Sequence, residues 1–193
     1  MKKFRQELTD FIRSVYEGEQ KVLVFGEGDA HARLMLVGEA PGEQEALLGR
    51  PFVGRAGKNL DEFLALSGFQ RDQLYITNTV KFRPVRMSGA GRIVNRAPTR
   101  EEVALFLPWL KREIKLVAPQ CVVTLGNTAL RALCGGQASV GQAHGRFIRQ
   151  DGMLLYPMYH PASLIYNPAL RQAYEADIRR LALWRQTGET PDD

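Results

Sequence analysis

The architecture of this chain follows from Leu34-Met35-Leu36-Val37-Gly38-Glu39-Ala40-Pro41-Gly42. The first four residues are apolar without alternation, which is typical of a strand buried on both faces of a parallel sheet. Glu39 places a carboxylate directly after that strand, and Pro41-Gly42 indicates a turn. Ligands of open α/β sheets bind beyond the carboxyl ends of the strands. The segment therefore predicts both a fold class and the place of a site.

Three more apolar segments predict further strands. With the first strand at residues 33–37, they lie at residues 74–80, 121–125 and 154–159. A shorter pair, residues 146–150 and 153–156, is joined by Asp151-Gly152, a dipeptide that favours a tight hairpin. Alternation of strands with helical patterns is typical of a sheet covered on both faces. We expect a three-layer α/β/α sandwich around a central, mostly parallel four-stranded sheet.

Helix signals separate these strands. Residues 56–67 carry apolar side chains at helical spacing, and Gly68 is a suitable stop. Thr99 is a suitable N-cap for a helix that runs to about residue 117, with Pro108 inside it as a possible kink. Further helices are predicted at residues 127–133, at 168–184 and within the first 20 residues, which we expect to pack outside the sheet.

Length and composition bound the class of protein. With 193 residues, 45% hydrophobic and 24% charged, the chain is expected to fold as one domain over residues 1–193. Within it, residues 1–20 are a helical extension and residues 187–193 a frayed tail. No segment approaches the roughly 18 apolar residues of a membrane span, and the N-terminus lacks the apolar region of a secretion signal. We therefore expect a cytoplasmic protein.

The net charge of +5 favours a polyanionic partner, although a solvated basic surface would give the same value. The distribution of the charge favours the first interpretation. Cations crowd one segment that also contains glycine and proline: Lys81, Arg83, Arg86, Arg92, Arg96 and Arg100. A basic, flexible loop beside a strand end is suited to contact phosphate groups.

The two cysteines do not form a metal-binding pattern. Cys121 begins an apolar strand and is expected in the core, and Cys134 precedes a glycine pair near a helix end. We assign no function to either thiol.

Polar side chains follow the predicted strands where chemistry is expected. Glu39 and Glu45 come after the first strand, Asn78 lies near the end of the second, and His160 follows the last. Each has a structural interpretation as well: Asn78 can satisfy loop backbone, and His160 can be a hydrogen-bonded loop residue. Phe52, in Gly49-Arg50-Pro51-Phe52-Val53-Gly54, can be a core residue. Their combination favours one site assembled from distant segments.

Four segments together resemble the signatures of the uracil-DNA glycosylases, and family 4 of that superfamily matches best. They are residues 38–42, 49–54, 75–78 and 160–164 (His160-Pro161-Ala162-Ser163-Leu164), in consistent order, and the resemblance runs from about residue 24 to residue 178. It implies a monomeric enzyme that hydrolyses the N-glycosidic bond of deoxyuridine in DNA during base excision repair. The uracil would be flipped from the stack into the pocket.

The resemblance also implies roles for individual residues. Phe52 would stack on the flipped ring, Asn78 would pair with uracil N3–H and O4, and His160 would donate to uracil O2. The turn residues Ala40, Pro41 and Gly42 would help to bind the base, with backbone amides around Glu39 and Ala40 as further donors. Leu164 resembles the residue that wedges into the duplex, and Ser163 beside it would contact DNA.

The water-activating group is less clearly marked. In the best-known branch of the superfamily an aspartate occupies the position of Ala40, which cannot act as a base. Glu45 resembles the family 4 candidate, and Glu39 is the second choice. A dissociative reaction through an oxocarbenium-like sugar depends more on leaving-group stabilisation, so we expect more from Asn78 and His160.

One departure from family 4 concerns metal. Members usually bind a four-iron cluster through four cysteines, and clusters require thiolates. The matching positions here are Phe11, Ser14, Phe82 and Phe106, so we expect no cofactor. The three aromatic residues are predicted to lie in one patch that replaces the cluster as a hydrophobic plug.

A second departure is the insert at residues 84–98, which is longer than in the family. A related branch captures uracil-DNA covalently through a histidine in a basic insert here, but this insert contains none. We expect it to grip single- or double-stranded DNA instead, through Arg83, Arg86, Arg92 and Arg96. The alternatives are a non-catalytic binder of damaged DNA and a glycosylase for hypoxanthine or xanthine. An unrelated nucleotide-binding protein is disfavoured because no phosphate loop is present.

Overall fold

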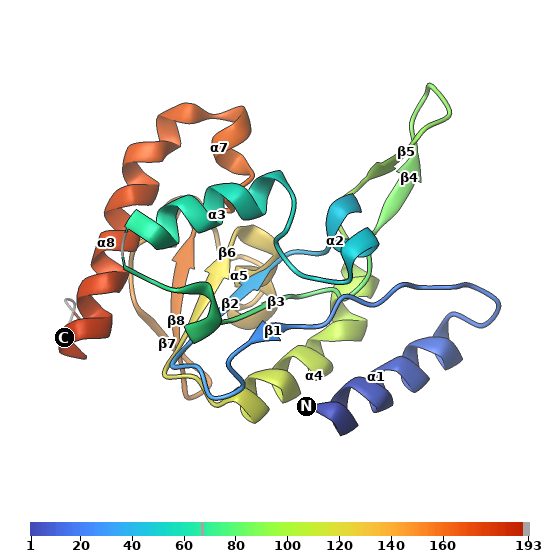
Figure 1. Cartoon of the computed structure of the whole chain (residues 1–193), viewed down its shortest axis with the longest axis horizontal. Helices are drawn as coiled ribbons and strands as arrows, with labels where there is room; N and C mark the ends of the chain where they lie inside the picture. Colours follow the sequence, from blue (N-terminus) through green and yellow to red (C-terminus); the bar gives the residue numbers. More distant parts are fainter. Residues whose placement is uncertain (67, 191–193) are drawn as a thin grey trace.

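A six-stranded sheet forms the centre of the computed structural model, which describes residues 1–66 and 68–190. Its strand order is β1-β3-β2-β6-β8-β7 (Figure 1). The four inner strands are parallel, and β1 and β7 are antiparallel edges. The strands are β1 (Glu27–Gly28), β2 (Leu34–Gly38), β3 (Tyr75–Asn78), β6 (Cys121–Leu125), β7 (Ile148–Gln150) and β8 (Met153–Met158).

The edges correct the predicted four-stranded sheet. The four predicted strands are the four parallel ones, and the predicted hairpin is β7 and β8. Asp151 and Gly152 join them with φ of 49° and 77°, as a tight hairpin turn requires. Strand β1 contributes two residues, paired with Ile76 and Tyr75, and so short a strand has no hydrophobic pattern to recognise.

Helices cover both faces of the sheet and complete the three layers (Figure 1). Helices α3 and α8 lie on one face and α4 and α5 on the other, with α1 outside α4. The helices are α1 (Lys2–Val15), α2 (Glu43–Leu48), α3 (Arg55–Leu66), α4 (Arg100–Val117), α5 (Asn127–Cys134), α6 (Val140–Ala143), α7 (Ser163–Tyr166) and α8 (Arg171–Thr187), with 3-10 turns η1 (Arg71–Gln73) and η2 (Pro168–Leu170). None of the described helices is long and apolar enough to cross a membrane.

The expected helices agree closely with these bounds. Thr99 caps α4, accepting from the Glu102 N–H at 3.2 Å, while the Glu102 carboxylate accepts from the Thr99 N–H at 2.7 Å. Ser67, the last residue of one predicted helix, and residues 191–193 of the predicted tail lie outside the described residues. Residues 188–190 follow α8 without regular structure.

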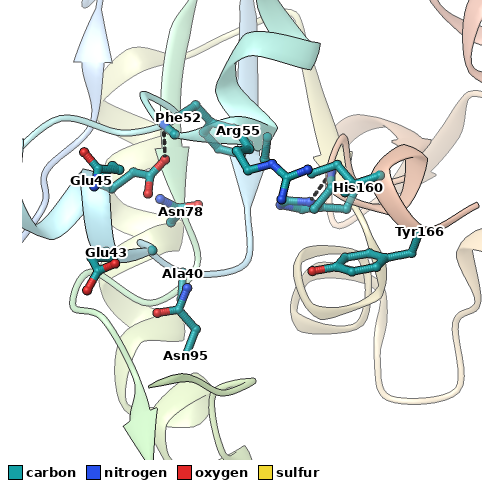
Figure 2. Close-up of a pocket in the computed structure, with 15 residues that line it drawn as sticks. Ala40, Glu43, Glu45, Phe52, Arg55, Asn78, Asn95, His160 and Tyr166 are labelled. Atoms are coloured by element: carbon teal, nitrogen blue, oxygen red, sulfur yellow. Dashed lines mark hydrogen bonds between the residues drawn. The ribbon is translucent and has the colours of Figure 1, made fainter. Parts of the chain in front are cut away.

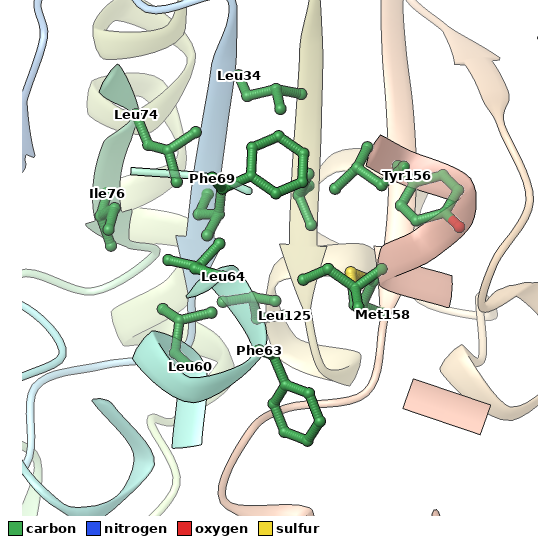
Figure 3. Packing of buried hydrophobic residues seen from close by; sticks show 14 of the residues in the cluster. Leu34, Leu60, Phe63, Leu64, Phe69, Leu74, Ile76, Leu125, Tyr156 and Met158 are labelled. Carbon is green, nitrogen blue, oxygen red and sulfur yellow. The ribbon is translucent and has the colours of Figure 1, made fainter. Parts of the chain in front are cut away.

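Alternate side chains of β2 enter two different cores. Leu34 and Leu36 pack with α3 and α8 (Figure 3), whereas Met35 and Val37 pack with α4 and α5. Burial of both faces explains why the strand is apolar without alternation. The sheet is therefore fixed on two sides, and its carboxyl edge is a rigid base for the loops that follow it.

A third core contains the residues at the cluster positions. Phe82 and Phe106 are buried with ring centroids 5.6 Å apart, and Phe11 is half-buried against Trp109 at 5.3 Å. All three belong to the apolar cluster between α1, α4 and the segment after β3, so the predicted patch is confirmed. Ser14 is exposed and its hydroxyl donates to the Phe11 carbonyl oxygen.

The basic insert is a β-hairpin rather than a flexible loop. Strands β4 (Val85–Met87) and β5 (Ile93–Asn95) pair antiparallel and project away from the sheet (Figure 1). At its base, the Arg96 guanidinium donates to both Glu102 carboxylate oxygens at 2.6 Å. This bidentate pair attaches the hairpin to the start of α4.

Candidate active site

A cavity of about 320 Å³ opens beyond the carboxyl ends of β2 and β3 (Figure 2). Parallel strands end at the same edge, so the loops that follow them meet there although they are distant in sequence. The structure brings the predicted Glu45, Phe52, Asn78 and His160 together around this cavity, with Ala40 and Gly42 of the turn. Pro41 is buried and is not among the lining residues.

Asn78 ends β3 at the floor of the cavity. It is only 3% exposed, and its carboxamide has no hydrogen-bond partner within residues 1–66 and 68–190. The alternative that it satisfies loop backbone is therefore wrong for the described part of the chain. Its amide is not among the fully buried polar groups without a partner, which is consistent with its lining the cavity. Asn78 is therefore placed to pair with a ligand.

Phe52 and Gly38 shape the space beside Asn78. Phe52 is buried, and its φ of 54° lies in the left-handed region that bulky residues rarely occupy. A Cβ atom at Gly38 would lie 2.5 Å from both Phe52 Cζ and Asn78 Oδ1. Only glycine at this strand end lets the ring and the carboxamide approach so closely. The Phe52 and His160 rings are 5.7 Å apart and inclined by 28°.

His160 follows β8 and is held as a neutral imidazole. Burial lowers the pKa of His160 to about 4, against the opposing effect of the Glu45 charge. The Ala162 backbone N–H donates to His160 Nδ1 at 3.1 Å, so Nδ1 is an acceptor. The proton of the neutral ring therefore lies on Nε2. The cavity receives a hydrogen-bond donor without a formal positive charge.

The two candidate glutamates occupy different environments. Glu45 lines the cavity and is nearly buried, and its Oε1 accepts from the Val53 and Gly54 N–H groups at 3.1 and 2.8 Å. Glu39 is not among the lining residues, and its Oε2 accepts from the Thr128 hydroxyl. The geometry therefore favours Glu45 as the carboxylate that faces a ligand.

Several residues that line the cavity were not among the predicted site residues, and four of them carry polar or aromatic side chains at its rim. Arg55 and Glu43 begin α3 and α2, Asn95 ends β5, and Tyr166 ends α7 (Figure 2). Tyr166 is 85% exposed, which is unusual for a large aromatic residue. Arg55 directly follows the motif at residues 49–54, and Tyr166 lies two residues after the motif at residues 160–164. This closeness to a motif was the one signal in the sequence that could have identified them as site residues. For Asn95 the signal was its place in the basic insert.

The predicted DNA-contacting residues differ in whether their side chains already have a partner within the protein. Arg83 donates to Asn95 Oδ1 and pairs with Glu43, and Arg96 pairs with Glu102. Arg86 and Arg92 are exposed on the hairpin, and their side chains have no polar partner among the described residues. Ser163 and Leu164 are half-buried, with Leu164 packed against the larger core.

The chain does not fit a cluster held by four cysteines. Three of the four positions are aromatic side chains in an apolar core, and the fourth is a serine, so none offers a thiolate. Cys121 is buried in β6, and burial raises the pKa of both thiols. Among the described residues, no group of three or more His, Cys, Asp or Glu side chains could hold a metal ion.

The fold and the cavity define an α/β protein whose sheet carries, at its carboxyl edge, a pocket lined by an aromatic side chain, a carboxamide and a neutral imidazole. Comparison with known sequences gives its family. The profile of the Uracil DNA glycosylase superfamily matches residues 25–182. The chain belongs to that superfamily, as its motifs predicted.

Relatives with curated names align with most of the chain. It is 37% identical to the type-4 uracil-DNA glycosylase of Sulfurisphaera tokodaii over 86% of this chain and 74% of the relative. It is 40% identical to the type-4 enzyme of Thermotoga maritima over 82% of this chain and 80% of the relative. A type-5 uracil-DNA glycosylase of Pyrobaculum aerophilum is 36% identical over 72% of this chain and 66% of the relative.

Proposed function

We propose that this protein is a uracil-DNA glycosylase that hydrolyses the bond between uracil and deoxyribose in DNA and leaves an abasic site. One observation carries the assignment to this pocket: the carboxamide of Asn78, a residue only 3% exposed, faces the cavity beside Phe52 and His160 and has no partner among the described residues. The names and coverage of the relatives support the same activity.

Recognition of the base follows from the groups around the cavity. Uracil presents an N3–H donor next to an O4 acceptor, which the Asn78 amide oxygen and nitrogen complement. Cytosine reverses the two, with an N3 acceptor next to an N4 donor. The Phe52 ring would stack on the face of the base, and a base must leave the duplex to reach it.

Bond cleavage is assigned to His160 and Glu45. As the bond between C1′ and N1 breaks, its electron pair moves to uracil and charge develops on O2. The neutral His160 donates a hydrogen bond from Nε2 to O2 and stabilises that charge. The Glu45 carboxylate faces the electron-poor sugar and accepts the proton of the water that adds to C1′. Glu39 is the second candidate for the base that accepts this proton.

DNA is expected to lie across the rim of the pocket. Arg86 and Arg92 of the hairpin can contact phosphate, whereas Arg83 and Arg96 hold the hairpin in place. Tyr166 is better exposed than Leu164 and can stack on a base next to the flipped nucleotide. Leu164, which is half-buried against the larger core, and Ser163 beside it remain the predicted wedge and DNA contact. A cytoplasmic location and a monomeric state remain predictions from the sequence.

The test is single-turnover base release from labelled single- and double-stranded oligonucleotides that contain one deoxyuridine, with Asn78→Asp as the paired variant. We expect abasic product from the wild type and gain of cytosine release by the variant. An oligonucleotide with hypoxanthine or xanthine tests the alternative bases. Retardation of uracil-containing DNA in a gel without any release would overturn the proposal in favour of a binder.

A further inference from the structure

A buried charged pair lies behind the pocket and has no role in the chemistry above. Lys81 follows β3 and Glu113 belongs to α4, and both side chains are 0% exposed. Lys81 Nζ and Glu113 Oε2 are 2.5 Å apart. Removal of two charges from water is unfavourable, and apolar residues of similar size are often at least as stable in such a place. Stability alone therefore gives no reason for this pair.

The Lys81 ammonium group makes three short hydrogen bonds, which match its three donors. It donates to Glu113 Oε2 at 2.5 Å, to the Thr77 hydroxyl at 2.6 Å and to the Asn78 carbonyl oxygen at 2.6 Å. Glu113 is held in turn by the Tyr75 hydroxyl at 2.9 Å. The network thus ties α4 to the end of β3 on the face opposite the Asn78 side chain.

These contacts fix the peptide group that follows Asn78. The carbonyl oxygen of Asn78 is bound by Lys81, and the N–H of Thr79 donates to the Gly38 carbonyl oxygen at 2.8 Å. The Thr79 hydroxyl donates to that same oxygen at 2.8 Å. A peptide plane held at both ends is restrained from rotating, and this restrains the Cα–Cβ direction from which the Asn78 carboxamide extends.

We propose that Lys81, held by Glu113, is a positioning residue that orients Asn78 toward the base. This inference rests on the proposed function, in which Asn78 reads uracil. Substrate groups displaced by about 1 Å can lose on the order of 100-fold in rate. We therefore expect Lys81→Met to lower the single-turnover rate constant for uracil release from DNA by roughly 10- to 100-fold.

A double-mutant cycle separates positioning from a structural effect. Lys81→Met is measured in the wild type and in an Asn78→Ala background, because Lys81 can act through Asn78 only where the carboxamide is present. The loss is expected in the wild type and is expected to vanish in the Asn78→Ala background. Lys111→Met on the exposed side of α4 is the matched control, and it is expected to leave the rate unchanged both in the wild type and in the Asn78→Ala background.

If Lys81→Met does not fold, the double variant Lys81→Met/Glu113→Leu is used in its place. This double variant removes both charges and leaves no unpaired buried charge. Equal losses with and without the Asn78 carboxamide, or no loss in the wild-type background, would overturn the inference. A wild type that releases no uracil would instead refute the proposed function. Thermal unfolding of every variant shows that the folded protein is being compared.

Discussion

His160 shows how one side chain acquires a defined chemical state from its surroundings. An exposed histidine changes charge near pH 6.5, within the range where a cell works. In this pocket, burial lowers the pKa of His160 to about 4, and the Ala162 N–H occupies Nδ1. The ring can then serve as a neutral donor at any pH at which the protein is useful.

The pH dependence of base release tests this state. The single-turnover rate is expected to show no transition near pH 6.5 and to fall as pH drops through about 4, because protonation of Nδ1 removes the bond from Ala162. Rates measured from pH 3 to 8 check this, with His160→Asn as a variant that cannot titrate. A transition near pH 6.5 in the wild type alone would contradict it.

The same pKa has a consequence for stability. The folded pKa is below the unfolded value, so between about pH 4 and 6.5 the unfolded chain binds more protons at this residue. The contribution of His160 to the free energy of unfolding is therefore complete above about pH 6.5 and is lost as pH falls toward 4. Urea unfolding of the wild type and His160→Asn at several pH values measures it.

At the scale of elements, the hairpin of β4 and β5 contains two kinds of arginine: one that attaches the hairpin to α4 and two that are exposed to solvent. Arg96 is attached to Glu102 at its base, whereas Arg86 and Arg92 are exposed further along it. An isolated two-stranded hairpin is marginally stable in water, so its attachment to α4 determines where its cations lie. These arginines are close in sequence and were predicted to share one role. In the folded protein Arg96 has a structural role, whereas Arg86 and Arg92 are available to contact phosphate.

The salt dependence of DNA binding distinguishes the two kinds of arginine. Each phosphate contact adds about 0.7 to 0.9 to the slope of log affinity against log salt concentration. Arg86→Gln/Arg92→Gln removes two such contacts and is expected to reduce that slope by about 1.4 to 1.8 on uracil-free DNA, without changing the melting temperature. Arg96→Gln is expected to lower the melting temperature instead.

Arg13→Gln is the control for this measurement, because Arg13 is an exposed cation on α1 that does not belong to the hairpin. Binding is followed by fluorescence anisotropy at several salt concentrations. An unchanged slope in the double variant would remove the hairpin from the DNA interface.

At the scale of the whole molecule, α1 is attached to the glycosylase domain through the third apolar core. Phe82 follows β3 by a few residues, and Phe106 belongs to α4, so this core borders the segment that carries Asn78 and Lys81. The aromatic residues at the predicted cluster positions pack together in this core by hydrophobic burial. We propose that this packing supports the active-site segment at the place where the cluster of related enzymes is expected.

Removal of one ring tests this support. Phe106 is 0% exposed, and Phe106→Ala is expected to lower the free energy of unfolding by about 3 to 5 kcal/mol, as loss of a buried phenyl ring usually does. Urea unfolding provides the measurement, and Leu183→Ala on the exposed side of α8 is the control. A change below about 1 kcal/mol would show that this core contributes little.

Much of this arrangement could be predicted from the sequence, because the inner strands, α4 and the β7–β8 turn are determined by local patterns. Leu34 to Val37 are apolar throughout since both faces of β2 are buried, and Thr99 is a cap wherever its helix packs. Strand β1 could not be predicted, because its two residues pair only where β3 is already present. The rim residue Tyr166 was missed for a similar reason, since its exposure depends on how α7 leaves the sheet.

The sequence by itself determined the fold class, the family and the residues that meet at the pocket, because these depend on hydrophobic periodicity and on motifs of fixed spacing. Only the tertiary structure decided which glutamate faces the cavity, which arginines are free, and that Lys81 holds the backbone of Asn78. Those facts depend on contacts between residues far apart in the chain, such as Lys81 with Glu113, and on the burial that these contacts create. Local sequence patterns do not determine which distant residues come into contact, so these contacts are known only from the three-dimensional structure.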